Sequence, residues 1–95
     1  MERTFIVIEQ SVICNADNGY RVEIDYGWDG ERFETFKRAQ HHGFKSRGSD
    51  DFNICILEGN TLVDYLWMNK CMDDPEGMRL IAEQNGFDLA PKVEA

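Results

Sequence analysis

Residues 52–68 read FNICILEGNTLVDYLWM, with one largely apolar run before Gly59 and Asn60 and one after them. Glycine at the first central position of a two-residue return is typical of a type II′ turn. Such a turn places Ile54 opposite Tyr65, and cross-strand pairs of β-branched and aromatic side chains stabilise a sheet. The segment therefore predicts a β-hairpin.

The second strand of this hairpin has an alternative interpretation as a helix. Leu62, Tyr65 and Leu66 also have near-helical spacing, and a helix over residues 61–73 has a permissible length. The Gly-Asn turn and the aromatic, β-branched composition favour the strand, and the helix remains the alternative.

The same order of strand, turn, strand and helix occurs earlier in the chain. A strand is predicted over residues 3–14, turn chemistry follows around residues 18–19, and residues 20–26 alternate between apolar and charged side chains. Pairing the two strands outward from the turn puts Glu9 opposite Asp25. This register gathers the apolar residues on one face and the acids on the other.

One amphipathic helix is predicted after each hairpin. The first covers residues 31–42, with Asp29 as its cap and Gly43 as its stop, and a loop follows over residues 44–51. The second covers residues 75–85, where proline occupies the first position and a Gly-Phe pair follows the end. Its predicted inward stripe is Met78, Ile81 and Ala82.

These elements predict an α+β fold. Each hairpin needs a helix to cover its apolar face, so we expect a four-stranded antiparallel sheet with two helices packed on one face, in the order ββαββα. Residues 1–88 are expected to form a single domain, and residues 89–95 a loosely ordered C-terminal tail.

The composition narrows the classes of function. The 95 residues are 42% apolar, which is enough for one packed core, and 18 acidic against 10 basic residues leave a net charge of −8. That charge disfavours direct binding of nucleic acid, whose phosphates attract basic surfaces. No run approaches the ~20 apolar residues of a membrane span, and the start lacks the pattern of a secretory signal. We therefore expect a cytoplasmic protein.

Two groups of acids offer carboxylates to a cation or to acid–base chemistry. Asp73, Asp74 and Glu76 are better explained as the cap and the acidic first turn of the second helix. Asp50 and Asp51 precede a strand, where turn formation or protection of a sheet edge explains them. Neither group predicts a metal site or a general acid.

The histidines and cysteines predict no chemistry either. His41 and His42 are adjacent on a helix, so their side chains point about 100° apart and do not form a joint ligand face. Cys14, Cys55 and Cys71 have no neighbouring base or helix N-terminus to lower a thiol pKa. We expect no catalytic residue, no cofactor, no metal ion and no enzymatic activity.

The second face of the predicted sheet is the feature that points to a function. With both helices on the first face, it remains open as a mixed acidic and apolar surface, which is typical of a protein interface. A loop, the tail or a second copy of the chain covering this face is the alternative. The residues expected to contact a partner are Glu9, Glu23, Asp25, Asp64, Leu57, Leu62 and Leu66.

Part of the chain resembles small uncharacterised proteins of bacteriophages and mobile elements. The resemblance rests on GSDDFNI at residues 48–54, EGNTL at residues 58–62 and Trp67-Met68, and it extends over about residues 33–74. It implies no activity and no functional residues. In that genomic context, small acidic proteins often resemble inhibitors of host defence, including anti-CRISPR proteins, some of which occupy nucleic-acid channels with acidic surfaces.

Charge and resemblance together lead to one expected function. We expect a non-enzymatic protein-binding protein, an anti-CRISPR-like inhibitor in the host cytoplasm. Its expected partner is the basic surface of a host protein that handles nucleic acid, rather than nucleic acid itself or a membrane. The alternative is a small structural or regulatory homodimer assembled through the open sheet face.

Overall fold

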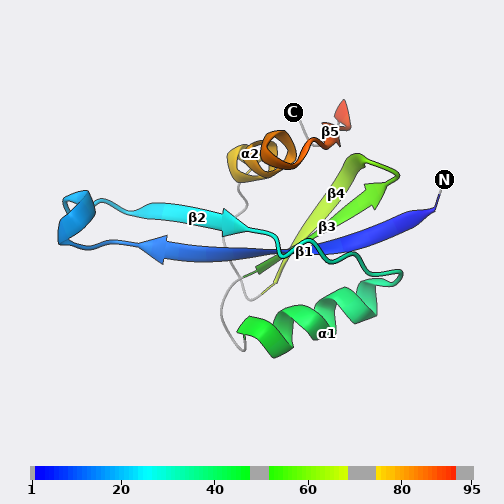
Figure 1. The fold of residues 1–95 in the computed structure, drawn as a ribbon, viewed down its shortest axis with the longest axis horizontal. Helices are drawn as coiled ribbons and strands as arrows, with labels where there is room; N and C mark the ends of the chain where they lie inside the picture. The colour runs from blue at the N-terminus through cyan, green and yellow to red at the C-terminus, as the bar shows by residue number, and fades with distance from the viewer. Residues whose placement is uncertain (1, 48–51, 69–74, 92–95) are drawn as a thin grey trace.

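The computed structural model describes residues 2–47, 52–68 and 75–91, without the side chains of residues 10–13, 23–25, 47, 67–68, 75–76 and 78. Figure 1 shows a central sheet with a helix on either side and a long hairpin that projects from it. The elements in chain order are β1 (Arg3–Ile13), the 3-10 turn η1 (Ala16–Asn18), β2 (Glu23–Gly27), α1 (Phe36–Arg47), β3 (Phe52–Glu58), β4 (Thr61–Met68), α2 (Pro75–Asn85) and β5 (Asp88–Leu89).

The sheet confirms the α+β class and corrects its details. It has five strands in the order β2-β1-β3-β4-β5, and β5 runs parallel to β4 while the other neighbours are antiparallel. The predicted order ββαββα is therefore extended by one strand. Gly86, with a φ of 73°, turns the chain back after α2. The amide of Asp88 then donates to Asn60 O at 3.0 Å and that of Ala90 to Leu62 O at 3.0 Å, so this part of the predicted tail is held in the sheet.

The two helices lie on opposite faces of the sheet, so the predicted placement on one face is wrong (Figure 1). On β1, Ile6 and Ile8 pack towards α2, whereas Phe5 and Val7, which alternate with them, pack towards α1. Every residue of β3 from Phe52 to Leu57 is buried. Central strands that are apolar on both sides need cover on both sides, and one helix supplies each.

The core consequently has two parts. Beneath α2 the buried residues are Ile6, Ile8, Cys55, Leu57, Leu62, Ile81, Ala82 and Phe87. Beneath α1 they are Val7, Ala39, Phe52 and Ile54, with Phe5, Phe33 and Phe36 packed against them. The prediction that Ile81 and Ala82 face inward is confirmed, and the side chain of Met78 lies outside the described residues.

α1 begins later and ends later than predicted. Residue 33 still forms a bridge with β1, because the amides of Phe5 and Phe33 each donate to the other's carbonyl at 2.9 and 2.8 Å. Thr35 then caps the helix, since its Oγ1 accepts from Arg38 N at 3.1 Å. Asp29 is therefore not the cap. Gly43 is not a stop either, because it is buried inside the helix against Phe52.

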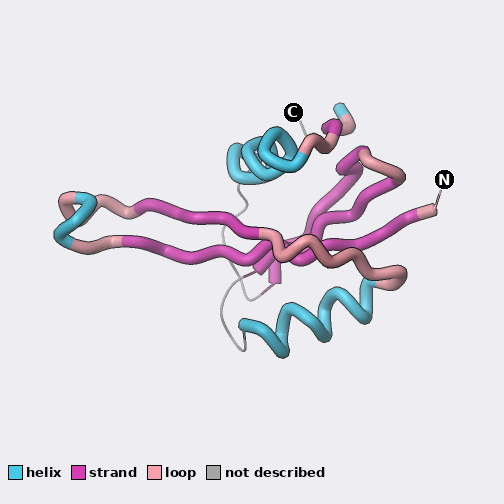
Figure 2. The backbone as a smooth tube through the Cα atoms, viewed as in Figure 1, coloured by secondary structure: helices cyan, strands magenta, loops and turns pink. Residues whose placement is uncertain are grey.

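The first hairpin forms a long arm (Figure 2). β1 pairs with β3 through its first half and with β2 through its second half, where Glu9 lies opposite Gly27 and Val12 opposite Ile24. This register is shifted by two residues from the predicted one, in which Glu9 lay opposite Asp25. The shift arises because residues 14–22 form a structured loop around η1 rather than a tight return.

The second hairpin confirms the strand over residues 61–68, and residues 69–73 of the competing helix lie outside the described residues. The two-residue turn is also confirmed: Glu58 lies opposite Thr61, and Gly59 has a φ of 63°. An irregularity after Leu62, at Val63, then shifts the register by one residue. Such a bulge moves the following residues to the other face.

Candidate functional site

Two of the residues predicted to meet a partner belong to the core. Leu57 and Leu62 lie opposite each other on β3 and β4 and are 0% exposed beneath α2. They are not available to a partner in the folded domain, because the face expected to stay open is the face that α2 covers. Leu66 is 45% exposed, since the bulge places it opposite Ile54 on the other side of the sheet.

The predicted acids do not share one surface with the leucines. Glu9 is half-buried where β1 passes from β3 to β2, and Asp64 is half-buried on β4. Strand β4 is separated from β2 by two strands. The backbones of Glu23 and Asp25 lie opposite Ile13 and Ser11 on the arm, and their side chains lie outside the described residues. The structure therefore brings three of the predicted acids to the arm and leaves Asp64 and Leu66 elsewhere.

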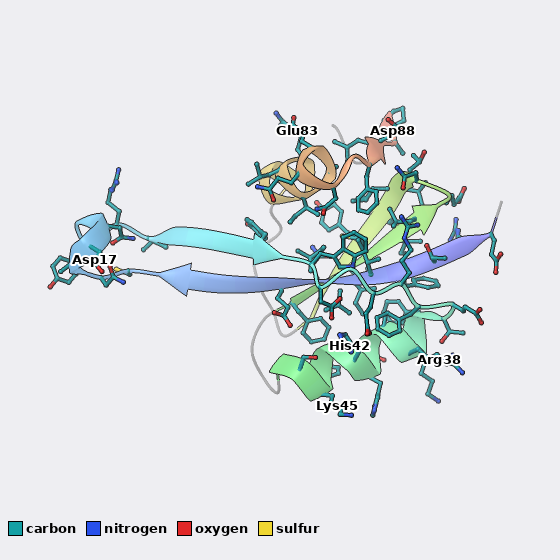
Figure 3. All side chains as sticks on the ribbon, viewed as in Figure 1. Asp17, Arg38, His42, Lys45, Glu83 and Asp88 are labelled. Carbon is teal, nitrogen blue, oxygen red and sulfur yellow. The ribbon has the colours of Figure 1, made fainter. Side chains whose placement is uncertain are left out.

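The end of the arm presents an exposed apolar pair. Tyr20 and Val22 are each 72% exposed, and in Figure 3 the labelled Asp17 marks this end, far from both helices. We call residues 14–22 the arm tip. The exposure of Tyr20 and Val22 contradicts the sequence prediction, which places both side chains on the buried, apolar face of a strand.

The arm tip is held by its own hydrogen bonds. Asn15 Oδ1 accepts from Asp17 N at 3.0 Å, and Asn18 Oδ1 accepts in turn from Asn15 N at 3.1 Å. The side chain of Asn18 also donates to Arg21 O at 2.8 Å, and Arg21 Nε donates back to Asn18 O at 3.1 Å. These reciprocal bonds satisfy backbone donors and acceptors of a turn that is largely exposed.

Tyr20 is in the left-handed region of backbone space, with a φ of 60°. Side chains other than glycine pay roughly 1–2 kcal/mol for this conformation. The tip nevertheless holds it, because Tyr20 N donates to Asn15 O at 2.8 Å and the thiol of Cys14 donates to Tyr20 O at 3.3 Å. A strained residue that is also exposed is an observation from which a functional role is inferred.

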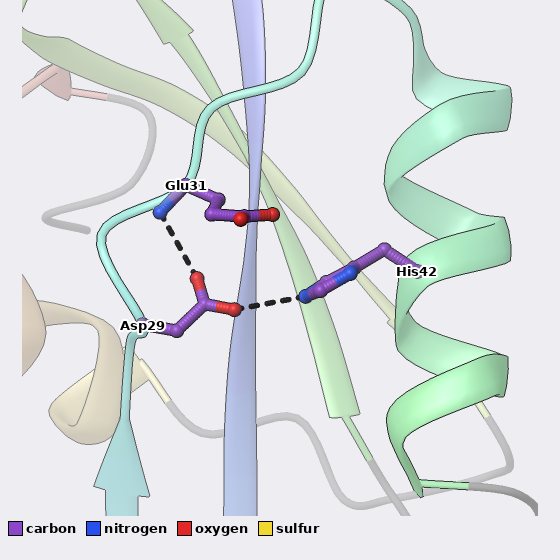
Figure 4. Close-up of side chains that lie close together, drawn as sticks. All are labelled: Asp29, Glu31 and His42. Atoms are coloured by element: carbon purple, nitrogen blue, oxygen red, sulfur yellow. Dashed lines mark hydrogen bonds and ion pairs between the residues drawn. The ribbon is translucent and has the colours of Figure 1, made fainter.

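A second cluster joins the loop after β2 to α1 (Figure 4). Asp29 Oδ2 and His42 Nε2 are 2.9 Å apart, and Asp29 Oδ1 accepts from Glu31 N at 3.0 Å. One donor atom from each of Asp29, Glu31 and His42 lies within 4.8 Å of the others. An imidazole and two carboxylates form a donor set able to hold a divalent cation.

Sequence reasoning missed this cluster because it treated Asp29 as the cap of a helix that ended at His42. In the structure the chain between residues 29 and 35 runs back along α1, so the loop meets the middle of the helix at His42. His41 is not part of this cluster: its side chain is exposed and lies away from the three donor atoms.

The contacts of Asp29 lower its pKa from the ordinary value of 3.8. Partial burial acts in the opposite direction, but hydrogen bonds from Glu31 N–H and His42, together with the charge of His42, outweigh it. Because the folded-state pKa is below the unfolded one, the stabilisation is complete above about pH 4 and is lost as the pH falls through the folded value.

We expect Asp29→Asn to flatten the acid limb of the stability profile. Its effect near pH 7 should be below about 1 kcal/mol, because the Asp29 side chain is nearly half exposed to water, which screens the pair. Urea unfolding between pH 2 and pH 7 in the presence of EDTA measures this. Asp17→Asn at the arm tip is the matched control and should keep the wild-type profile. An Asp29→Asn profile as steep as that of the wild type would contradict the assignment.

The remaining candidates from the sequence carry no site among the described residues. Burial raises the pKa of the Cys55 thiol, which therefore stays protonated and unreactive. Cys14 is exposed at the arm tip, and Cys71 lies outside the described residues. Also outside them are Asp50, Asp51, Asp73, Asp74 and the side chain of Glu76.

Comparisons with known proteins return no relative: no family model, no curated protein and no solved structure matches the chain. Within the described residues, no helix is long and apolar enough to cross a membrane.

Proposed function

We propose that this chain is a non-enzymatic protein-binding protein that docks through the arm tip onto a basic surface of its partner. The observation that carries the proposal is Tyr20, an exposed aromatic residue held in a strained conformation at the end of a projecting hairpin. Aromatic side chains are the most frequent anchors of protein interfaces. Val22, equally exposed, extends the apolar contact.

The charge of the arm supports a basic partner. Residues 9–27 contain four acids, Glu9, Asp17, Glu23 and Asp25, against one base, Arg21. In Figure 3 the labelled bases Arg38 and Lys45 lie on α1, away from Asp17. An acidic arm with an apolar tip would be steered towards a basic surface and would then be anchored by the tip. This arrangement keeps three of the acids predicted from the sequence and replaces the three leucines by Tyr20 and Val22.

A narrower form of the proposal is an inhibitor of a host protein that handles nucleic acid. It is supported by the net charge of −8, which suits a basic nucleic-acid channel, and by the resemblance of residues 33–74 to phage and mobile-element proteins.

A homodimer is the second candidate. Helices cover both faces of the central strands, so a dimer would instead use β2, which is an outer strand of the sheet.

Tyr20→Gly should change binding and stability in opposite directions. Glycine adopts a positive φ without steric cost, so the variant should gain up to about 1 kcal/mol in free energy of unfolding. It should also bind its partner at least about tenfold more weakly, because it loses the anchor. Urea unfolding gives the first quantity. The second comes from titration against a protein captured by the wild-type chain from a bacterial lysate at low salt and then purified.

Leu80→Ser is the matched control for binding, since Leu80 is 44% exposed on α2 and distant from the arm tip. It should bind like the wild type. Equal affinity of Tyr20→Gly and wild type would refute docking through the tip.

Reversal of Glu23 and Asp25 to lysine tests whether the acidic arm attracts a basic partner. Unchanged affinity at low salt would refute that attraction. Light scattering over a range of concentrations separates the dimer, because a strict monomer excludes it.

A further inference from the structure

The cluster of Asp29, Glu31 and His42 lies apart from the arm tip, and it converges from two segments of the chain. Asp29 and Glu31 come from the loop after β2, and His42 comes from the middle of α1. Figure 4 shows both carboxylates extending from the loop towards the imidazole ring. We propose that these three side chains bind one divalent transition-metal ion, with Zn²⁺ as the best fit.

The surroundings of the cluster orient its ligands. The ring of His42 lies over that of Phe33, with centroids 4.9 Å apart and planes tilted by 40°. This contact directs Nε2 to the carboxylates. The loop is fixed as well, because Trp28 Nε1 donates to Glu31 O at 2.9 Å. Neighbouring groups that hold ligands in place are typical of metal sites.

The donor set favours zinc over calcium or magnesium. Imidazole nitrogen suits zinc and its neighbours in the transition series, whereas calcium and magnesium prefer oxygen ligands alone. Three protein ligands, two of them exposed, leave room for a water molecule as the fourth ligand, which is the usual composition of an open zinc site.

The distances require only small movements. Zinc ligands stand 2.0–2.2 Å from the metal, so two ligand atoms of a tetrahedral site lie about 3.4 Å apart. Asp29 Oδ2 and His42 Nε2, now 2.9 Å apart, must therefore separate by about 0.5 Å. The Glu31 oxygen lies within 4.8 Å of both and must approach by at most about 1.4 Å. Both movements fall on Asp29 and Glu31, whose side chains are exposed.

The first test is a titration of tag-free protein with ZnCl₂ by calorimetry and with CoCl₂ by visible absorption. A Cys14→Ser background removes the exposed thiol, which would otherwise compete for these metals. We expect saturation at one equivalent, with cobalt d–d bands that Zn²⁺ displaces. Uptake that does not saturate, or cobalt that stays in its aqueous spectrum, would overturn the proposal.

Three variants distinguish a metal site from a simple ion pair. The side chain of Glu31 takes no part in the contact between Asp29 and His42, so Glu31→Gln leaves that pair intact. Glu31→Gln and His42→Gln should each weaken Zn²⁺ binding by at least about tenfold. His41→Gln, at the exposed neighbouring position, should bind like the background protein.

Equal affinity in Glu31→Gln and the background would show that the three residues do not act together, and equal losses in His41→Gln and His42→Gln would assign the metal elsewhere. A thermal melt supplies a second readout. Zn²⁺ should raise the Tm of the background protein and not that of His42→Gln. This test is independent of docking through the arm tip, because it measures metal binding and because every variant is compared with the same Cys14→Ser background.

Discussion

Leu62→Ala should lower the free energy of unfolding by about 2–5 kcal/mol, the cost of removing most of a buried leucine side chain and leaving a cavity. Leu62 is 0% exposed and packs beneath α2 with Leu57 and Ile81. Leu66→Ala, four positions further along β4, should change the same quantity by less than about 0.5 kcal/mol, because Leu66 is 45% exposed. Urea unfolding followed by circular dichroism measures both.

This pair of variants tests the central correction to the fold. If both helices covered one face, Leu62 and Leu66 would lie together on the open side, and both substitutions would cost little. Similar small effects would therefore contradict the placement of α2 over β3 and β4. A large loss for Leu62→Ala alone supports both the opposite placement of the helices and the bulge at Val63 that separates the two leucines.

Gly43→Ala should destabilise the protein by about 1–3 kcal/mol, although alanine is the better helix former. A Cβ atom at residue 43 would overlap the Cε2 atom of Phe52. Phe52 is itself 0% exposed and lies at the centre of the core beneath α1. Either the buried ring must leave its present packing or the helix must shift away from the sheet, and both changes cost stability.

Gly27→Ala is the control, because a Cβ atom there meets nothing within 4 Å. Its stability should stay within about 0.5 kcal/mol of the wild type. Combining Gly43→Ala with Phe52→Leu tests the cause: the double variant should lose less than the sum of the two single losses, since the smaller side chain relieves the overlap. A stabilising effect of Gly43→Ala, as helix propensity alone predicts, would refute the close approach.

The candidate sites were less predictable than the elements that carry them. The sequence drew attention to Asp29, His42 and Tyr20, but it indicated a helix cap for Asp29, a helix position without a ligand role for His42 and a strand for Tyr20. The roles of Asp29 and His42 depend on where α1 begins, and that of Tyr20 depends on the register of the first hairpin. Neither feature can be read from the identity of a single residue. The spacing of Asn15 and Asn18, which cap each other's backbone, is the one local sign of a structured tip.

The burial of both faces of the central strands could in part be predicted from the sequence. The apolar run Phe5–Ile8 and the run Phe52–Leu57, in which Asn53 is the one polar residue, are typical of strands buried on both sides. They favour helices above and below the sheet. The alternation in residues 20–26 indicates a strand with one solvent-exposed face. The prediction assumed that the whole sheet has such an exposed face. In the structure, residues 23–26 of that alternating segment belong to strand β2, which forms part of the arm.

Local chemistry alone determined the α+β class, the two-residue turn at Gly59 and Asn60, and the bounds of α2 at Pro75–Asn85. Backbone angles and neighbouring hydrogen bonds control these features, and both act over a few residues. Tertiary contacts decided the face that each helix covers, the burial of Leu62 and the meeting of Asp29 with His42. Each of these depends on how distant segments exclude water together, and no short stretch of chain encodes that.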